Sequence, residues 1–341
     1  MKNRLEKRKI VVIFFWLIVC INYIYSQECS DGYTYFPLLP ETATIIPDNT
    51  GVDSDSCLYT DDLGVLNNII TENNLNYSNA IDIGNQTWKY GRLRGLVASY
   101  SPNGSGGVNA QLTVLPESFG NLDSLAFLYL EWNSLTNLPN SFSQLTNLIS
   151  LTLNNNWLTS LPADFGNINQ LYFLDLGYNQ LNSIPGSICQ MGNLQYLYLF
   201  NNQLDSMPSC MCDLNIDWSG NDGGGFPYFG IGGNYLCSCE GNIPSCIENS
   251  THFELTLDQF YYSIPMTAPQ ECCEACIPIG DMNFDGTWNV LDIVALANCV
   301  LSNNCEDLPN SCAGDMNFDN GYNVLDIVAL ANCVLAQNCD G

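Results

Sequence analysis

The feature that most constrains this chain is a repeat of 23 residues between Leu115 and Pro208. A proline closes each unit, at positions 116, 139, 162, 185 and 208, and leucines recur at fixed places between them. Self-similarity at a period of about 20 to 50 residues indicates a solenoid or an array. One unit cannot bury its leucines alone, so neighbouring units must stack and share a core. The sequence therefore predicts a stack of coils over this stretch.

Each unit carries the pattern LxxLxLxxNxL, in which the leucines face the shared core. Leu128 and Leu130 of the first unit alternate with a period of two, which indicates a short strand. Asn133 ends this strand, where its side chain can bond turn amides that no neighbouring strand reaches. The same position is asparagine in the next three units: Asn156, Asn179 and Asn202. We therefore expect a ladder of asparagines along the stack.

This pattern resembles the leucine-rich repeat family, and the resemblance covers four consecutive units. It implies an α/β-type solenoid with short parallel strands and an irregular convex side. We place the repeats at residues 112–209, after an N-terminal leader and repeat cap at residues 27–111. Such a cap is required because the first coil would otherwise expose its leucines.

A helix is expected inside that cap, in the run TDDLGVLNNIITENN. Three apolar residues fall on one helical face: Leu63, Leu66 and Ile70. Thr60 or Asp61 can cap its start, because their side-chain oxygens accept hydrogen bonds from free amides of the first turn. We read this helix as part of the shield over the open end of the stack.

The period fails after Pro208, where cysteines become frequent. We read residues 210–250 as a cysteine-rich C-terminal cap and residues 251–279 as a linker or small adaptor. Five cysteines lie in the cap: Cys210, Cys212, Cys237, Cys239 and Cys246. Zinc is an alternative use of these thiols, but the CxC spacing differs from the usual CxxC. We expect disulfides, with the pairing left open.

The N-terminus has the pattern of a secretory signal. The basic stretch MKNRLEKRK precedes an apolar run, and Ser26 before Gln27 suits cleavage. We assign residues 1–26 to a signal peptide, because the apolar run is too short for a membrane span; an uncleaved anchor is the alternative. Losing Cys20 leaves sixteen of the seventeen cysteines, an even number that fits disulfides in an extracellular, oxidising location. The released chain is expected to have no membrane contact.

The chain is strongly acidic, with a formal net charge of −27. Five of its eight basic residues fall in the first nine positions, which leaves Lys89, Arg92 and Arg94 for the rest. Such a surface repels phosphate backbones, so we expect no nucleic acid partner. It suits calcium, or solubility alone.

Residues 280–301 and 314–335 are near copies, GDMNFDGTWNVLDIVALANCVL and GDMNFDNGYNVLDIVALANCVL. Each begins with an oxygen-rich loop of calcium-binding spacing, because side chains at alternate positions can wrap one ion that takes hard oxygen ligands. The first loop offers Asp281, Asn283, Asp285, Thr287, Asn289 and Asp292. The second offers Asp315, Asn317, Asp319, Gly321, Asn323 and Asp326. We expect two Ca²⁺ ions.

Within each loop the ligands have different roles. Thr287 and Gly321 contribute a backbone carbonyl, and Asn289 and Asn323 act through water. The closing carboxylate is aspartate where the general pattern prefers glutamate. Gly286 allows a sharp turn in the first loop, and Asn320, which tolerates positive φ, stands there in the second. The alternative is that these acids merely stabilise two helix N-termini.

These loop–helix units resemble the type I dockerin family over residues 280–341. The resemblance implies a small all-α module that calcium folds and that docks on a cohesin domain of a scaffold. The positions that commonly read cohesin hold Val290 and Leu291, and Val324 and Leu325, where serine or threonine is usual. The resemblance therefore supports calcium binding by this chain more directly than it supports a cohesin-like partner. The spacing between Cys299 and Cys305 recurs between Cys333 and Cys339. It suggests one disulfide clip in each copy, but spacing alone does not establish the pairing.

A binding face is expected on the strand side of the solenoid. Outward positions next to the core leucines are rich in aromatic residues: Phe127, Tyr129, Trp132, Phe173, Asp175, Tyr178, Tyr196, Tyr198 and Phe200. Tyrosine and tryptophan supply large contact area with a polar handle, as recognition hot spots do. The alternative is that these rings only pack against one another along the sheet.

No catalytic constellation emerges. The single histidine, His252, lies in the presumed linker, where a surface position is the simplest interpretation, and it has no evident nucleophile to serve. We therefore interpret the chain as a secreted, non-catalytic binding protein. Its repeats are expected to recognise an extracellular protein or glycan, and its calcium module to attach it to a partner. The alternative, from the dockerin resemblance alone, is an accessory subunit of a polysaccharide-degrading complex; a terminal module that only staples the chain end is a third.

Overall fold

The computed structural model describes residues 29–46, 56–101, 106–236, 243–260, 262–270, 279–283, 285–305, 311–317, 321–336 and 339. The chain divides into two compact units, residues 1–270 and 271–341. The first unit contains the repeats, and the second contains the two near-identical copies.

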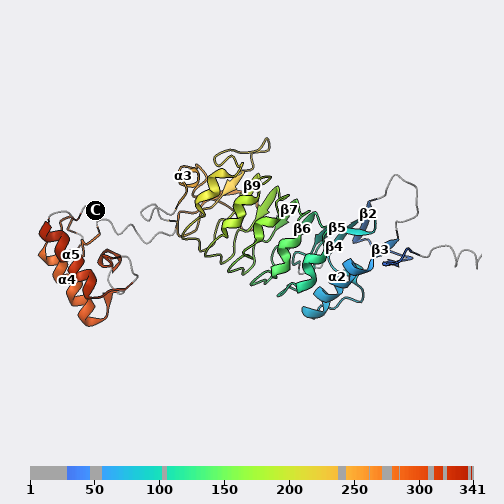
Figure 1. The fold of residues 1–341 in the computed structure, drawn as a ribbon, viewed down its shortest axis with the longest axis horizontal. Helices are drawn as coiled ribbons and strands as arrows, with labels where there is room; N and C mark the ends of the chain where they lie inside the picture. The colour runs from blue at the N-terminus through green and yellow to red at the C-terminus, as the bar shows by residue number, and fades with distance from the viewer. Residues whose placement is uncertain are drawn as a thin grey trace, which may run out of the picture. The chain divides into compact units, whose positions relative to one another are not determined.

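One sheet of eight short strands runs through the first unit, in the order β10-β9-β8-β7-β6-β5-β4-β2 (Figure 1). Its members are β2 (Ala43–Ile46), β4 (Asn85–Lys89), β5 (Arg92–Val97), β6 (Phe127–Tyr129), β7 (Ser150–Thr152), β8 (Phe173–Asp175), β9 (Tyr196–Tyr198) and β10 (Phe229–Gly230). Neighbouring strands are parallel except β4 and β5, which form an antiparallel hairpin. One buried leucine from each regular coil lies in register: Leu128, Leu151, Leu174 and Leu197. The predicted parallel stack is confirmed.

The return path of each coil is built from short 3-10 helices. They are η2 (Glu117–Asn121), η3 (Asn140–Gln144), η4 (Phe165–Asn167), η5 (Gly186–Gln190) and η6 (Ser209–Asp213). The proline that closes a unit stands at the N-cap of every one of these except η4, because its fixed φ suits a helix start. Phe119, Phe142 and Phe165 stack inside this side, with successive ring centroids 5.7 and 6.2 Å apart.

The expected asparagine ladder is present and buried. Asn179 accepts a hydrogen bond from Leu158 N at 3.0 Å and donates through Nδ2 to Leu153 O and Leu176 O, each at 3.0 Å. Equivalent bonds are made by Asn133, Asn156 and Asn202. Each asparagine therefore joins its own coil to the preceding one.

The stack extends beyond Pro208, where the regular period ends. Asn234 continues the ladder, accepting from Leu204 N and donating to Leu199 O, both at 3.0 Å. It lies 32 residues after Asn202 rather than 23, so this last coil carries nine additional residues. Phe229 of β10 takes the place that leucine occupies in the regular coils.

An N-terminal cap closes the other end of the sheet. It contains β1 (Tyr33–Tyr35), β3 (Cys57–Tyr59), helix α2 (Thr60–Glu72) and η1 (Ala80–Asp82), and Cys29 forms a disulfide with Cys57. The helix exists as predicted, but its N-cap is Tyr59 and no side chain caps it. Leu63, Leu66 and Ile69 are buried while Ile70 is half-buried. The buried stripe is therefore rotated slightly from the predicted one.

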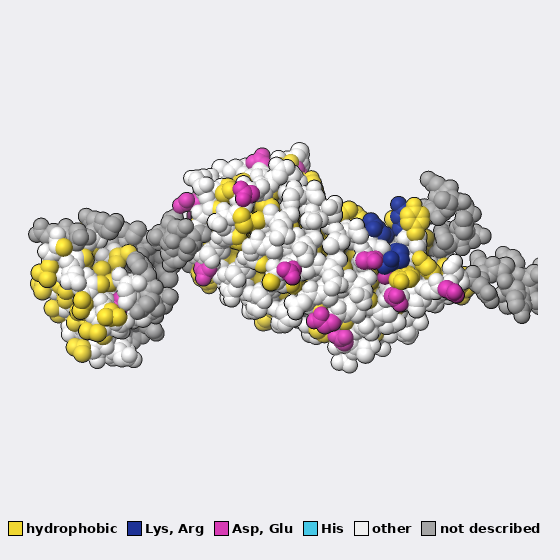
Figure 2. All heavy atoms as spheres, viewed as in Figure 1, with side chains coloured by type: hydrophobic (Ala, Val, Ile, Leu, Met, Phe, Trp, Pro, Cys, Tyr) yellow, Lys and Arg dark blue, Asp and Glu magenta, His cyan; other side chains and the backbone are white. Residues whose placement is uncertain are grey.

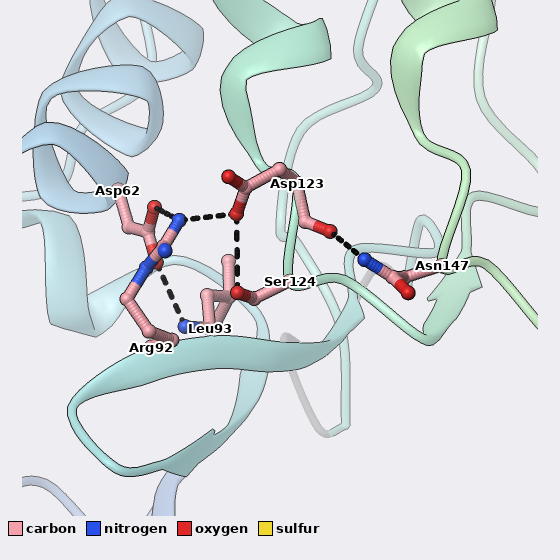
Figure 3. A network of polar contacts seen from close by, with 6 residues as sticks. All are labelled: Asp62, Arg92, Leu93, Asp123, Ser124 and Asn147. Carbon is pink, nitrogen blue, oxygen red and sulfur yellow. Dashed lines mark hydrogen bonds and ion pairs between the residues drawn. The ribbon is translucent and has the colours of Figure 1, made fainter.

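A polar network fixes this helix to the sheet (Figure 3). The Arg92 guanidinium donates to both oxygens of Asp62, at 2.9 and 3.0 Å, and to Asp123 Oδ1 at 2.6 Å. Leu93 N also donates to Asp62, whose side chain is only 1% exposed. Asn147 Nδ2 donates to Asp123 O at 2.7 Å, which carries the network into the next coil. The buried carboxylate of Asp62 is thus compensated by two neighbouring residues of β5, Arg92 and Leu93.

The C-terminal end of the first unit folds back onto the stack. Short helix α3 (Ser245–Glu248) follows, and the disulfide Cys212–Cys246 ties it to η6, which the disulfide Cys189–Cys210 joins to η5. Cys210 and Cys212 are therefore not free thiols for zinc, and Cys237 and Cys239 lie outside the described residues. Strands β11 (Leu255–Leu257) and β12 (Pro265–Thr267) then form an antiparallel hairpin.

The second unit contains α4 (Val290–Ser302), η9 (Ser311–Gly314) and α5 (Val324–Ala336). Leu296 and Leu330, equivalent residues of the two copies, are fully buried in a shared core. The two suggested clips, Cys299–Cys305 and Cys333–Cys339, are both disulfides. Within the described part of the chain, no helix has the length and apolarity that crossing a membrane requires.

Candidate functional site

The outward strand positions divide into an exposed and a covered group. Phe127 is 43% exposed, and Tyr129 and Trp132 are half-buried. Further along the sheet an aromatic cluster forms from Phe173, Tyr178, Tyr196, Tyr198 and Phe200 together with Leu257 and Tyr262. Within this cluster Tyr198 is 3% exposed and Phe200 is fully buried. The sheet face is thus less open than the sequence suggested.

The covering element is the hairpin of β11 and β12. Both strands of the hairpin lie in the stretch that the sequence predicts to be a linker, residues 251–279. They contact the last coils instead. Tyr178 Oη donates to Leu257 O at 2.7 Å, and Asn201 Nδ2 donates to Thr256 Oγ1 at 2.6 Å. The hairpin also continues the hydrogen bonding of the sheet, because Gly232 N donates to Leu255 O at 2.9 Å.

The loop between the two hairpin strands reaches towards earlier coils. Gln259 Nε2 donates to Asn155 Oδ1 at 2.8 Å, and the ring of Phe260 stacks on Trp132 with centroids 5.3 Å apart. Phe260 is nevertheless 74% exposed. The hairpin therefore occupies part of the predicted binding face and leaves the region around Phe127 open.

A cavity of about 330 Å³ lies beside the hairpin. It is lined by Phe173, Tyr196, Tyr198, Asp222, Phe226, Leu257 and Tyr262. The regular strands supply three of these residues. The hairpin supplies two, and the nine-residue extension of the last coil supplies Asp222 and Phe226. Pockets of this size, mainly apolar with a few polar groups, are the usual form of small-ligand sites.

The polar atoms around this cavity are fixed by internal bonds. Tyr196 Oη donates to Asp222 Oδ2 at 3.0 Å, and Tyr198 Oη donates to Pro227 O at 2.7 Å. Asp222 Oδ1 accepts from the amides of Phe226 and Gly224, which lower the pKa of Asp222 and keep it ionised. Burial raises the pKa of both Tyr196 and Tyr198, so their hydroxyls stay protonated.

Two more acids lie under the same face. Asp175, predicted as an outward ligand-binding residue, is 2% exposed and accepts from Gly177 N at 2.9 Å. Burial, with a smaller contribution from the charge of Glu131, raises the pKa of Asp175 to about 8. Glu131 accepts hydrogen bonds from Ser99 and Thr152. Asp175 is therefore largely protonated at neutral pH and is an interior group.

The first acidic loop of the second unit folds around its own carboxylates. Asp281 accepts from Asp285 N at 3.2 Å and from Gly286 N at 2.9 Å, so the loop closes back on its first residue. Gly286 has φ of +77°, which permits that turn. Asn283 Nδ2 donates to Asp285 at 3.1 Å, and Thr287 also donates to Asp285. The hydroxyl of Thr287 is the main cause of the lowered pKa of Asp285.

Asp292 closes the loop from the helix that follows. Its Oδ1 accepts from Met282 N at 2.9 Å, and its Oδ2 accepts from Asn289 N at 2.9 Å as one half of a capping box. Asp326 repeats these bonds with Met316 N and Asn323 N, at 3.0 and 2.9 Å. Helix-start stabilisation, the alternative interpretation of these aspartates, is thus present. Asp319 and Asn320 lie outside the described residues, so the second loop is described only in part.

The charge around these loops favours a bound cation. Asp292 and Asp326 are fully buried. Residues 271–341 contain eleven acidic residues and no Lys, Arg or His. Backbone amides compensate a buried carboxylate only in part, and a bound cation would supply further compensating charge. The carboxylate, amide and carbonyl oxygens present are the donors that calcium takes.

No three His, Cys, Asp or Glu side chains gather closely enough to hold a metal by themselves in the described segments. Calcium at these loops would therefore need asparagine and backbone oxygens as well as carboxylates, as the predicted ligand set already includes. The residues present fit the ion in kind, and the ion itself stays a prediction.

Comparisons with known proteins bear on the repeat unit. The leucine rich repeat family matches residues 147–204. These coils are leucine-rich repeats. A comparison with curated proteins finds no match.

Two solved structures are similar to part of the chain. One is a leucine-rich repeat protein of Leptospira interrogans, with 29% identity, a TM-score of 0.31 and coverage of 41% of this chain and 38% of that chain. The other is a chain of the BIR3–SERK2 complex of Arabidopsis thaliana, with 29% identity, a TM-score of 0.33 and coverage of 43% and 71%. This chain thus spans less than half of the Leptospira protein.

Outside the leucine-rich repeats, His252 does not lie at the surface as predicted. It is 9% exposed, and burial lowers its pKa. Its backbone amide donates to Ser250 Oγ, and Nδ1 has no hydrogen-bond partner among the described residues. A neutral, buried imidazole of this kind is a core residue rather than a general base.

Sequence reasoning missed Asp222, Phe226, Leu257 and Tyr262 as parts of the site. All four belong to segments without the 23-residue period, so no repeat position marked them. Their only signal was composition, because GNDGGGFPYFG and DQFYYS are rich in aromatic residues.

Proposed function

We propose that this chain is a secreted, non-catalytic binding protein. In this proposal the strand side of its leucine-rich repeats recognises an extracellular protein or glycan, and its C-terminal loops bind two Ca²⁺ ions. The observation that carries the proposal is the aromatic cavity on the sheet face, together with exposed Phe127 on β6, two strands away from β8. Leucine-rich repeat domains generally mediate protein binding, and extended sheet faces suit that role.

Disulfides support an extracellular location. Five are formed between the described cysteines. Disulfides persist in oxidising compartments and are rare in the cytosol. The secretory pattern of residues 1–26 lies outside the described residues and agrees with this proposal.

The exposed faces of the C-terminal helices support a docking role for that unit. Apolar side chains cover much of its visible surface (Figure 2). Equivalent residues of the two copies are exposed alike: Val290 63%, Leu291 58%, Val324 63% and Leu325 60%. Exposed apolar patches on a small module mark interaction sites. A cohesin-like partner is the occupant that the dockerin resemblance suggests.

Calorimetric titration of the full secreted chain with calcium tests the metal component. We expect two ions to bind with affinities between about micromolar and about millimolar. Asp281→Ala and Asp315→Ala should each lose one ion, whereas Asp205→Ala, a matched change at an exposed acid of the repeats, should lose none. Absence of any heat of binding would remove calcium from the proposal.

Screening the full chain for binding to extracellular proteins and glycans tests the binding part of the proposal. A partner of the sheet face should lose at least about tenfold in affinity when Phe127 is changed to Ala, since a hot-spot aromatic contributes about 2 kcal/mol or more. Trp157→Ala removes an exposed ring that does not line the cavity, and it should leave the affinity unchanged. Equal losses for both variants would place recognition elsewhere.

A further inference from the structure

The cavity on the sheet face is built by the two segments that depart from the regular repeat. The extension of the last coil turns back on itself, with Asp222 N donating to Phe226 O at 2.8 Å, and brings both residues to the cavity. The hairpin adds Leu257 and Tyr262 from the other side. Two independent insertions converging on one hollow are unexpected if the coils only needed to stack.

The walls of the cavity are aromatic faces set at steep angles. Phe173 meets Tyr198 edge-on, with an interplanar angle of 85° and centroids 5.5 Å apart, and meets Tyr196 at 39°. Phe226 also lines the cavity and is 45% exposed. Flat ligands stack on a flat platform, whereas a compact cation is attracted by several ring faces at once.

The polar groups also select between ligand types. The hydroxyls of Tyr196 and Tyr198 already donate within the protein, so Tyr262 Oη is the only lining hydroxyl with a hydrogen left to offer the oxygens of a glycan. The carboxylate of Asp222 is the one charged group among the lining residues. No Lys or Arg follows Arg94 in the sequence, so the repeats from β6 onward contain no basic side chain to compete for it.

We infer that this cavity binds the cationic side chain of a lysine or arginine from a protein partner. The aromatic walls would hold the ammonium or guanidinium group by cation–π attraction, with the Asp222 carboxylate at the mouth. The acidic chain would also draw a basic partner towards this face. The inference rests on the proposed binding role of the sheet face and names the chemistry that it reads.

Two capped peptides test it, glycyl-lysyl-glycine and the same peptide with norleucine in place of lysine. The side chains have nearly the same shape, and only lysine carries charge. Titrations of the full chain, followed by ligand-observed NMR, should show lysine binding at least about tenfold more tightly, equivalent to about 1.4 kcal/mol. Equal affinity for the two peptides, or no binding of either, would overturn the inference.

Two variants locate the effect. Asp222→Asn keeps an oxygen for the amides of Gly224 and Phe226 while removing the charge, and should reduce lysine affinity to the norleucine level. Asp205→Asn, at an exposed acid outside the cavity, should leave the preference intact. If Asp222→Asn does not fold, Phe226→Leu serves instead and should at least halve the lysine preference. A preference that survives changes at Asp222 and Phe226 would contradict the inference, while the calcium titration and the partner search would still judge the proposed function separately.

Discussion

At the scale of single residues, Asn179 shows how one side chain can join two coils. Its amide satisfies one backbone donor and two backbone acceptors, all of them buried. Unsatisfied buried polar groups cost about 1 to 3 kcal/mol each. The asparagine is therefore needed for hydrogen bonding rather than for its volume.

We expect Asn179→Ala to lower the free energy of unfolding of the repeat unit by at least about 2 kcal/mol, because three backbone groups lose their partner. Urea unfolding followed by circular dichroism measures this. Asn182→Ala, a matched change at an exposed position of the same coil, should cost less than about 0.5 kcal/mol. Similar losses for the two variants would show that the ladder is not stabilising.

Asp175 predicts a dependence of stability on pH. Its folded pKa, about 8, is raised from the ordinary 3.8. Stability from this group is therefore complete below about pH 4 and is lost as the pH rises through about 8. The charge of Glu131 adds to the raised pKa of Asp175, and the hydrogen bond from Gly177 N opposes it.

Thermal unfolding between about pH 4 and pH 9 should show Asp175→Asn losing less stability than the wild-type chain, because asparagine keeps an acceptor for Gly177 N without ionising. Asp164→Asn, at an exposed acid, should follow the wild-type curve. Parallel curves for the wild type and Asp175→Asn would mean that Asp175 ionises freely in the fold.

At the scale of elements, the parts that obey the period were predictable and the others were not. Proline, leucine and asparagine positions at 23-residue spacing predict the coils, because stacking demands identical geometry in each unit. The same spacing places Phe119, Phe142 and Phe165 in one column, where their rings stack. The sequence did not predict strand β10, because nine added residues shift Asn234 out of the 23-residue period.

The hairpin shows why the candidate site could not be read in full. Thr256 and Leu257 contact Asn201 and Tyr178, which are more than 50 residues away in sequence. Nothing local in LTLDQFYYS specifies that register. The sequence therefore predicts aromatic side chains along the sheet and misses that a distant segment covers some of them.

The testable prediction at this scale concerns the ion pair that fixes helix α2 to strand β5. Replacing Arg92 by Met leaves Asp62 buried without its cation, so we expect a loss of about 3 to 5 kcal/mol in unfolding free energy. Adding Asp62→Asn should recover part of that loss. Arg94→Met is the control, because Arg94 makes no ion pair among the described residues. Equal effects at Arg92 and Arg94 would contradict a structural role for the network.

At the scale of the whole molecule, charge is distributed unevenly. Figure 2 shows the described Lys and Arg side chains gathered at one end of the repeat unit. Every residue after Arg94 is acidic or neutral apart from His252. The second unit, with eleven acids and no base, should feel the strongest internal repulsion.

Salt should therefore stabilise the second unit more than the repeats when calcium is removed. In a chelator, raising NaCl from about 0.1 M to about 1 M shortens the screening length from about 10 Å to about 3 Å. Calorimetric scans should show the transition of residues 271–341 rising by more degrees than that of the repeats. A matched rise in both transitions would indicate a general salt effect instead.

The hairpin at the end of the sheet has one more consequence. At the end of each regular strand segment a backbone amide donates to the following coil, as Tyr178 N does to Phe200 O, and Gly232 N instead donates to Leu255 O. The hairpin therefore stands where another coil would otherwise add, and an unprotected strand edge is a template for pairing with a second chain. We therefore expect the hairpin to hinder end-to-end pairing of two copies of this chain at that edge.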